Sequence, residues 1–251
     1  CLLQRLAYNA SVYCLGRIRT WGCLMSQSDV MPGVNILPNL GVHIEKLNPF
    51  VFSALKKDCF DGVETIEKNF DKRSGDILQM FHQDLPKEFF FQEPTSSKES
   101  LTTEIIQLCN QLKNSFPEYI DKLNFGIDKE KEDHELYVER FWINYQRPGE
   151  FIPLHRHSGV FSFVVWVQLP QITIKNRNEK IEKFNLSKGY QGQFEFVYTD
   201  MLGQIKQLKL GHDKTWEGSV CVFPAELYHQ VYPHYEDELR ITVSGNIRAK
   251  I

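Results

Sequence analysis

The second half of the sequence is a series of short aromatic and β-branched runs separated by turns, and this pattern constrains the fold most. The runs are Leu136–Tyr145, Val160–Leu169, Gln193–Tyr198, Gln204–Leu210, Ser219–Phe223, Tyr228–Tyr232 and Leu239–Ile247. Such side chains pack well on a pleated surface, and the Gly, Pro and charged residues between the runs mark turns. Many short strands at this spacing predict a sandwich or a barrel. We therefore expect a mainly β protein whose helices pack outside the β core.

The first half of the chain has a different character. Residues 50–73 and 98–116 are the helical candidates, and the apolar residues of the second follow a helical period. Val30–Asn48 carries Pro and Gly between short apolar pairs, which indicates extended chain or an edge strand. We divide the chain into an N-terminal extension (1–24), a mixed helical and extended region that packs on the core (25–134), and a β domain (135–251).

Composition excludes several classes of protein. The chain has 251 residues, 42% of them hydrophobic and 24% charged, which is average for a globular protein and unlike a disordered chain or a coiled-coil rod. A net charge of −3 argues against a dedicated nucleic-acid binder. No apolar run approaches the roughly 20 residues of a membrane span. The six cysteines form no Cys-x-x-Cys pair, which favours reduced thiols and a cytoplasmic location.

Three histidines of the β region have the spacing of a metal site. His155 and His157 form a His-x-His pair, and alternation along a strand would turn both imidazoles to one face. His229 lies at the start of a later run. A histidine that stands alone is usually a surface or core residue, but two on one strand and a third on a distant strand can converge on one ion. The three histidines are therefore the candidate metal ligands.

A second feature points to an anion. Arg240 begins a run in which Arg240, Thr242 and Ser244 share one face of the strand. A guanidinium that points into a barrel needs a partner, because burying an isolated charge is very costly. The natural partner is a dicarboxylate, which Arg240 would hold with two hydrogen bonds while the Thr242 hydroxyl adds a third.

Three motifs together resemble the 2-oxoglutarate- and Fe(II)-dependent oxygenases. They are Asn144–His157 (NYQRPGEFIPLHRH), Phe223–His229 (FPAELYH) and Arg240–Thr242 (RIT). The resemblance covers about residues 135 to 250 and is closest to the prolyl-hydroxylase-like branch and to small bacterial and phage members of unknown substrate. It implies a double-stranded β-helix core, the jelly roll that cupins also share.

The resemblance also implies roles for single residues. His155 and His229 would be iron ligands, Arg240 would bind the distal carboxylate of 2-oxoglutarate, and Tyr145 and Thr242 would assist. The implied activity is that of a dioxygenase that uses Fe(II), O2 and 2-oxoglutarate, releases succinate and CO2, and oxidises a small-molecule or peptide substrate that the sequence does not identify.

The chain departs from the family pattern at one position. The family carries Asp or Glu where this chain has His157. A site of three histidines is more positive by one charge than a site of two histidines and a carboxylate. We take His157 as the third ligand, and the alternative is that water or Glu150 completes the coordination.

A cupin-type metalloprotein that does not use 2-oxoglutarate is the alternative function. The spacing of Gly218, Pro224 and His229 resembles the second cupin motif, although Glu226 replaces its glycine. The first cupin motif has a glutamate shortly after its His-x-His, and residues 159–162 contain none. This absence and the placement of Arg240 favour the oxygenase.

A third hypothesis is a jelly roll without catalytic activity that binds carbohydrate. Its ligand platform would consist of the aromatic residues Trp142, Trp166, Tyr190, Trp216 and Tyr232. Residues of this kind more often belong to a core, and the sequence does not place these five on one face.

Overall fold

The structure is a computed structural model that describes residues 33–37, 40–61, 96–115, 135–172, 190–200 and 202–250. The first strands and the helices are β1 (Gly33–Leu37), β2 (Leu40–Lys46), α2 (Pro49–Asp61) and α4 (Ser96–Ser115). The next elements are β3 (Leu136–Gln146), β4 (Ile152–His155), β5 (Phe161–Gln168), β6 (Phe194–Thr199) and β7 (Ile205–Leu210). The last are the short helix η3 (Lys214–Trp216), β8 (Ser219–Pro224), β9 (His229–Val231) and β10 (Arg240–Ala249).

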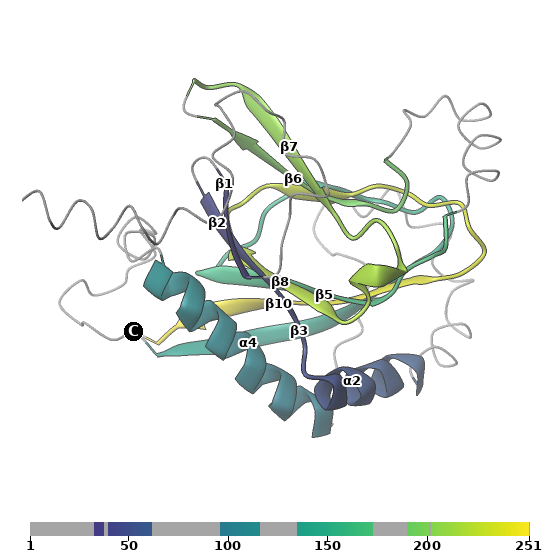
Figure 1. The fold of residues 1–251 in the computed structure, drawn as a ribbon, viewed down its shortest axis with the longest axis horizontal. Coiled ribbons are helices and arrows are strands. Elements are labelled where there is room, and N and C mark those ends of the chain that lie inside the picture. The colour runs from purple at the N-terminus through teal and green to yellow at the C-terminus, as the bar shows by residue number, and fades with distance from the viewer. Residues whose placement is uncertain are drawn as a thin grey trace, which may run out of the picture. The chain divides into compact units, whose positions relative to one another are not determined.

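Two antiparallel sheets form the core of the described structure. The larger has six strands in the order β1-β2-β8-β5-β10-β3, and the smaller has four in the order β4-β9-β6-β7 (Figure 1). From β3 onward the chain passes repeatedly between the sheets, so that β4 and β9 lie in the smaller sheet while β5, β8 and β10 lie in the larger one. This is the topology of a jelly roll. The predicted double-stranded β-helix is confirmed, and β1 is the edge strand expected from Val30–Asn48.

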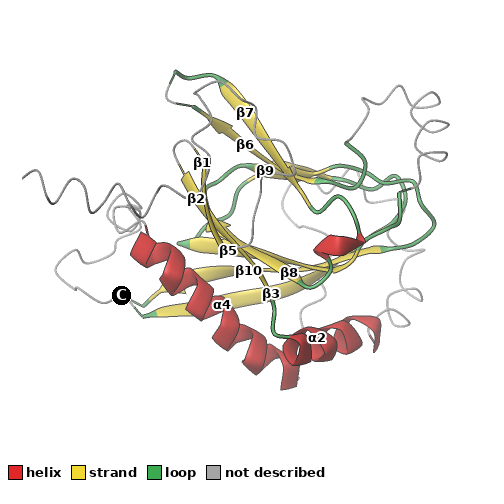
Figure 2. Ribbon diagram, in the orientation of Figure 1, coloured by secondary structure: helices red, strands yellow, loops and turns green. Residues whose placement is uncertain are grey.

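Helices α2 and α4 cover one face of the larger sheet (Figure 2). The apolar face of α4 consists of Leu101, Ile105, Leu108 and Leu112, which are all buried. Each such side chain contributes about 1.5–3 kcal/mol when it is fully buried. The two helices confirm both helical predictions, although residues 62–73 lie outside the described part of the chain. Neither α2 nor α4 is apolar and long enough to cross a membrane.

Alternation along β3 and β10 separates an apolar face from a polar one. The side chains that pack toward the helices are Phe141, Ile143, Tyr145, Ile241 and Val243. Their neighbours on the opposite face, which lines the interior between the sheets, are Trp142, Asn144, Gln146, Arg240, Thr242 and Ser244. The interior of the jelly roll is therefore polar along these two strands, and the candidate site lies there.

The predicted domain boundaries stay predictions. The boundary between residues 24 and 25 lies outside the described residues, and the one between 134 and 135 falls at the edge of an undescribed range. Within the described part, α2 and α4 share a single hydrophobic core with the larger sheet.

Candidate metal centre

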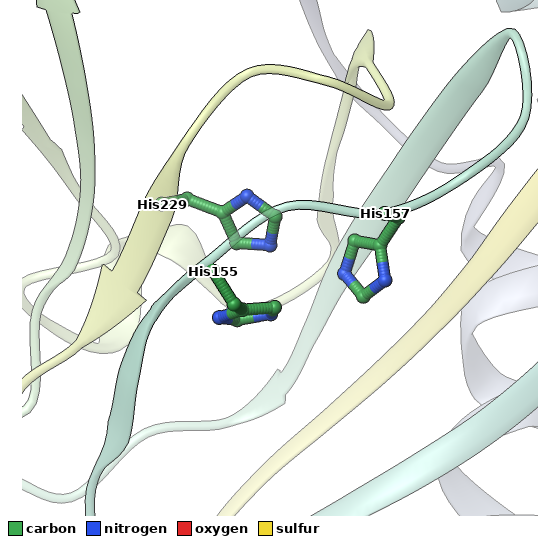
Figure 3. A group of neighbouring side chains, drawn as sticks. All are labelled: His155, His157 and His229. Carbon is green, nitrogen blue, oxygen red and sulfur yellow. The ribbon is translucent and has the colours of Figure 1, made fainter. Parts of the chain in front are cut away.

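The three predicted histidines converge in the interior (Figure 3). One ligand nitrogen from each lies within 4.8 Å of the others, and the ring centroids are separated by 4.3 to 5.0 Å. His155 is the last residue of β4 and faces His229, the first residue of β9, in the strand register. His157 lies two residues beyond the end of β4, so it reaches the cluster from a turn and not through strand alternation.

Backbone contacts hold this turn in place. The His157 backbone N–H donates to the carbonyl of Ala225, at 2.8 Å, and so fixes the turn against the end of β8. Gly159 then adopts a φ of +113°, and a Cβ at this position would lie 2.7 Å from the carbonyl oxygen of Ile247. Only glycine avoids both the strain and the overlap. The local sequence therefore lets the chain turn sharply from the histidine pair into β5.

Two of the imidazoles are oriented by hydrogen bonds to backbone carbonyls. Nδ1 of His155 lies 2.7 Å from the Pro153 oxygen, and Nδ1 of His229 lies 2.8 Å from the Leu227 oxygen. A carbonyl can only accept, so each Nδ1 carries the proton and each Nε2 keeps a free lone pair. This is how proteins commonly orient a histidine ligand toward a metal. The His157 ring instead packs against the Trp142 indole, with the ring centroids 5.5 Å apart.

Burial keeps the three imidazoles neutral. It lowers the pKa of His155, and together with the nearby His155 ring it lowers the pKa of His157 to about 4. The pKa of His229 lies well below 6.5, mainly because of burial and then because of the other two rings. Neutral imidazoles are the form that binds metal ions. The cluster can therefore hold a metal ion at neutral pH without first losing protons.

An apolar wall encloses His229, while His155 and His157 remain partly exposed. Phe194 stacks on the His229 ring with centroids 5.2 Å apart, and Phe223 meets it edge-on at 5.0 Å. Among the described residues, the cluster contains no carboxylate. Glu150, the alternative ligand, instead accepts a hydrogen bond from the Arg147 backbone N–H, at 2.7 Å. The ligand set that the structure offers is three neutral imidazoles.

Arg240 is a buried cation without a counter-ion among the described residues. Its side chain is fully buried, and its only hydrogen bonds within the described part of the chain are long ones from Nη1 to Gln146 Oε1 (3.4 Å) and Thr242 Oγ1 (3.5 Å). Nε and Nη2 have no hydrogen-bond partner among the residues that the structure describes. Burial lowers the pKa of Arg240 to about 9. Two unpaired donors on a buried cation form a position that an anion would fill.

Tyr145 does not lie at this site, contrary to the prediction. Its side chain points toward the helices, and its hydroxyl donates to the Cys59 carbonyl of α2 at 2.6 Å. The physical reason is strand alternation, which sends Tyr145 to one face of β3 and its neighbours Asn144 and Gln146 to the other. Sequence reasoning missed these two amides. Alternation places both on one face of β3, but the sequence alone does not show which face is the interior one.

A comparison with protein families matches the part of the chain that carries this site. Residues 140–246 match the family model described as "Putative 2OG-Fe(II) oxygenase". No curated protein sequence matches the chain. Among solved structures, a prolyl-4-hydroxylase from Pseudomonas putida is 14% identical over 85% of this chain and 95% of its own, with a TM-score of 0.45. AviO1 from Streptomyces viridochromogenes Tue57 is 12% identical over 85% and 91%, with a TM-score of 0.43.

A third solved structure, an oxidoreductase of the 2OG-Fe(II) oxygenase family from Burkholderia pseudomallei, is 17% identical over 46% of each chain, with a TM-score of 0.33. At these similarities the solved structures do not indicate a substrate for this chain. The segment matched by the family model contains His155, His157, His229 and Arg240. The resemblance predicted from the three motifs is confirmed: the part of the chain that carries the three histidines matches the 2OG-Fe(II) oxygenase family model.

Proposed function

We propose that the chain is a 2-oxoglutarate-dependent dioxygenase in which His155, His157 and His229 hold Fe(II). The donor set fits this ion, because imidazole nitrogen is a suitable ligand for iron and all three rings are neutral. Three neutral ligands leave the full charge of Fe(II) in place. A dianionic cosubstrate such as 2-oxoglutarate would neutralise that charge.

The observation that carries the proposal is that Nε and Nη2 of the buried Arg240 guanidinium have no partner among the described residues. A dicarboxylate that reached Arg240 through its distal carboxylate would supply the missing counter-ion to Nε and Nη2. The Thr242 hydroxyl accepts from Arg240 Nη1 and from Asn144 Nδ2, so its own proton is left to donate to the same carboxylate. The cosubstrate-binding role predicted for these two strand residues is therefore kept, without Tyr145.

Bound iron would supply the activation of O2, coupled to decarboxylation of 2-oxoglutarate to succinate and CO2. The residues of the chain bind, orient and exclude water. Arg240 and Thr242 would fix one end of the cosubstrate, and the rings of Phe194, Phe196 and Phe223 form an apolar wall beside His229. A wall of this kind keeps water from competing at the reacting centre.

The burial of Arg240 disfavours one alternative, and the burial of two tryptophans disfavours the other. A cupin-type enzyme that does not use 2-oxoglutarate has no need of a buried cation without a partner, yet Arg240 is fully buried. A carbohydrate-binding platform needs exposed aromatic rings, yet Trp142 is 5% exposed and Trp166 is fully buried. These two tryptophans belong to the interior of the jelly roll.

The substrate and the compartment are the finer parts of the proposal. We keep a small molecule or a peptide as the substrate class. The described cysteines, Cys59, Cys109 and Cys221, are all buried free thiols. Burial raises the pKa of each thiol, so they are inert, and their free state supports a reducing compartment such as the cytoplasm.

The direct test of the proposed function is turnover of 2-oxoglutarate without a substrate. Protein loaded with Fe(II) should convert 2-oxoglutarate slowly to succinate in air, and the His155→Ala and His229→Ala variants should not. If wild-type protein that has retained its iron releases no succinate and binds no 2-oxoglutarate, the cupin alternative replaces the oxygenase.

A further inference from the structure

Gln146, the last residue of β3, occupies a junction between the anion position and the strands that carry the histidines. It is 4% exposed and is the register partner of Arg240. Its Nε2 donates to the backbone carbonyl of Glu150 at 2.6 Å and to that of Tyr232 at 3.2 Å. Its Oε1 accepts from Arg240 Nη1 at 3.4 Å.

The chemistry of these partners fixes the orientation of the Gln146 amide. The Glu150 and Tyr232 carbonyls can only accept hydrogen bonds, so the NH2 group must face them. The opposite orientation would bring Oε1 against two carbonyl oxygens and the NH2 group against a guanidinium. Only the observed orientation presents an acceptor to Arg240, and it holds the Nη1 end of the guanidinium so that Nε and Nη2 remain available.

The two carbonyls belong to the segments that lead to and from the histidines. Glu150 lies in the turn that enters β4, which ends at His155. Tyr232 directly follows β9, which begins at His229. One side chain therefore connects the guanidinium to both strands of the smaller sheet that carry histidines. A keto acid that binds a metal at one end and Arg240 at the other spans this connection.

We infer that Gln146 is a positioning residue for the cosubstrate: it sets the place of Arg240 relative to the histidine cluster and so selects a keto acid with a second carboxylate at the right distance. The inference rests on the proposed function and adds a residue to it. Asn144 has the matching position one step along the same face, where its Nδ2 lies 3.4 Å from Thr242 Oγ1 and 3.3 Å from Ser244 Oγ.

The experiment compares two keto acids that differ only at the far end. 2-Oxoglutarate and 2-oxobutyrate present the same chelating group to a metal, but 2-oxobutyrate lacks the distal carboxylate. Affinities of Fe(II)-loaded protein for both are measured anaerobically by calorimetry. In Gln146→Leu, binding of 2-oxoglutarate should weaken roughly 10- to 100-fold, the value of one hydrogen bond to a charged group, while 2-oxobutyrate binding changes less than about twofold.

Tyr145→Phe is the matched control on the same strand. It removes the hydrogen bond to the Cys59 carbonyl on the opposite face of β3, so both affinities should stay at wild-type values. If Gln146 had a purely structural role, Gln146→Leu would bind the two keto acids more weakly by the same factor, and that result would overturn the inference. The inference would also be overturned if Gln146→Leu bound both keto acids with the same affinities as the wild-type protein.

A second variant covers the case in which Gln146→Leu does not fold. Gln146→Glu places a carboxylate beside Arg240, where it competes with the distal carboxylate of the cosubstrate, so 2-oxoglutarate should lose its advantage over 2-oxobutyrate. A retained advantage in this variant would reject the inference. If the wild-type protein binds neither keto acid, it is the proposed function that fails, and the two failures are thereby distinguished.

Discussion

Replacing Arg240 with methionine should make the metal-free protein more stable and the cosubstrate bind more weakly. Methionine is a flexible, apolar side chain that fills irregular space in a core. It removes a cation that is fully buried and has no carboxylate partner among the described residues. If Arg240 instead stabilised the fold, its replacement would lower the stability of the protein. The variant therefore separates a role in binding from a role in stability.

The size of the effect follows from the environment of the guanidinium. Burial lowers the pKa of Arg240 to about 9. One pKa unit corresponds to about 1.4 kcal/mol, so burial disfavours the charge by several kcal/mol. Part of this is recovered from Gln146 and Thr242, and replacing buried ion pairs with apolar residues of similar volume is often neutral or stabilising by about 1–4 kcal/mol. Losing the charge pair between Arg240 and the distal carboxylate should weaken the binding of 2-oxoglutarate by about 2–5 kcal/mol, or roughly 30- to several-thousand-fold.

Thermal unfolding of the metal-free protein and anaerobic calorimetry with 2-oxoglutarate measure the two effects. We expect a melting temperature higher by at least about 2 °C for Arg240→Met. Arg156→Met is the control, because Arg156 is exposed and pairs with the exposed Glu226 at 3.0 Å. It should change neither quantity appreciably. A lower melting temperature together with unchanged 2-oxoglutarate affinity in Arg240→Met would refute the reasoning.

The other predictions concern the histidines. His155→Ala and His229→Ala should each weaken the affinity for iron by orders of magnitude, so that metal analysis finds little iron in the purified variants. Full iron occupancy would remove these residues from the ligand set. His157→Asp should retain iron, since a carboxylate is a suitable ligand; complete loss would mean that three imidazoles are required. The metal-free protein should lose stability as the pH falls from 6.5 toward 4. The three imidazoles have lower pKa values in the folded protein than in the unfolded chain, so the unfolded chain binds more protons in this range. Equal urea stabilities at about pH 7.5 and about pH 5 would contradict this.

Much of the fold could be predicted because the apolar and aromatic runs that form strands are local features of the sequence. The runs that became β3, β5, β8 and β10 carry their apolar positions in the sequence itself, and the turns between them are marked by Gly and Pro. His155 and His157 were found for a similar reason, although not by the expected geometry. His157 joins the cluster through a turn fixed by the Ala225 carbonyl, a contact between segments that are distant in sequence.

The faces of β3 could not be predicted in the same way. The position of Tyr145 in a motif gives its place along the chain, but the direction of its side chain depends on the register with β10. That register contains a shift between Asn246 and Ile247. The partners of Gln146 are equally non-local, since one is the Tyr232 carbonyl beyond β9. Contacts of this kind depend on tertiary packing and leave no periodic signal in the sequence.

Anaerobic titration of Fe(II)-loaded protein with 2-oxoglutarate tests the central claim most directly. A keto acid that chelates Fe(II) gives a charge-transfer band in the visible spectrum, and the band requires no knowledge of the substrate. In wild-type protein we predict that the band saturates at one 2-oxoglutarate per chain. The band should be absent in His229→Ala, and in Arg240→Met it should saturate only at a much higher 2-oxoglutarate concentration. Wild-type protein that holds its iron and gives no band at saturating 2-oxoglutarate would contradict the account.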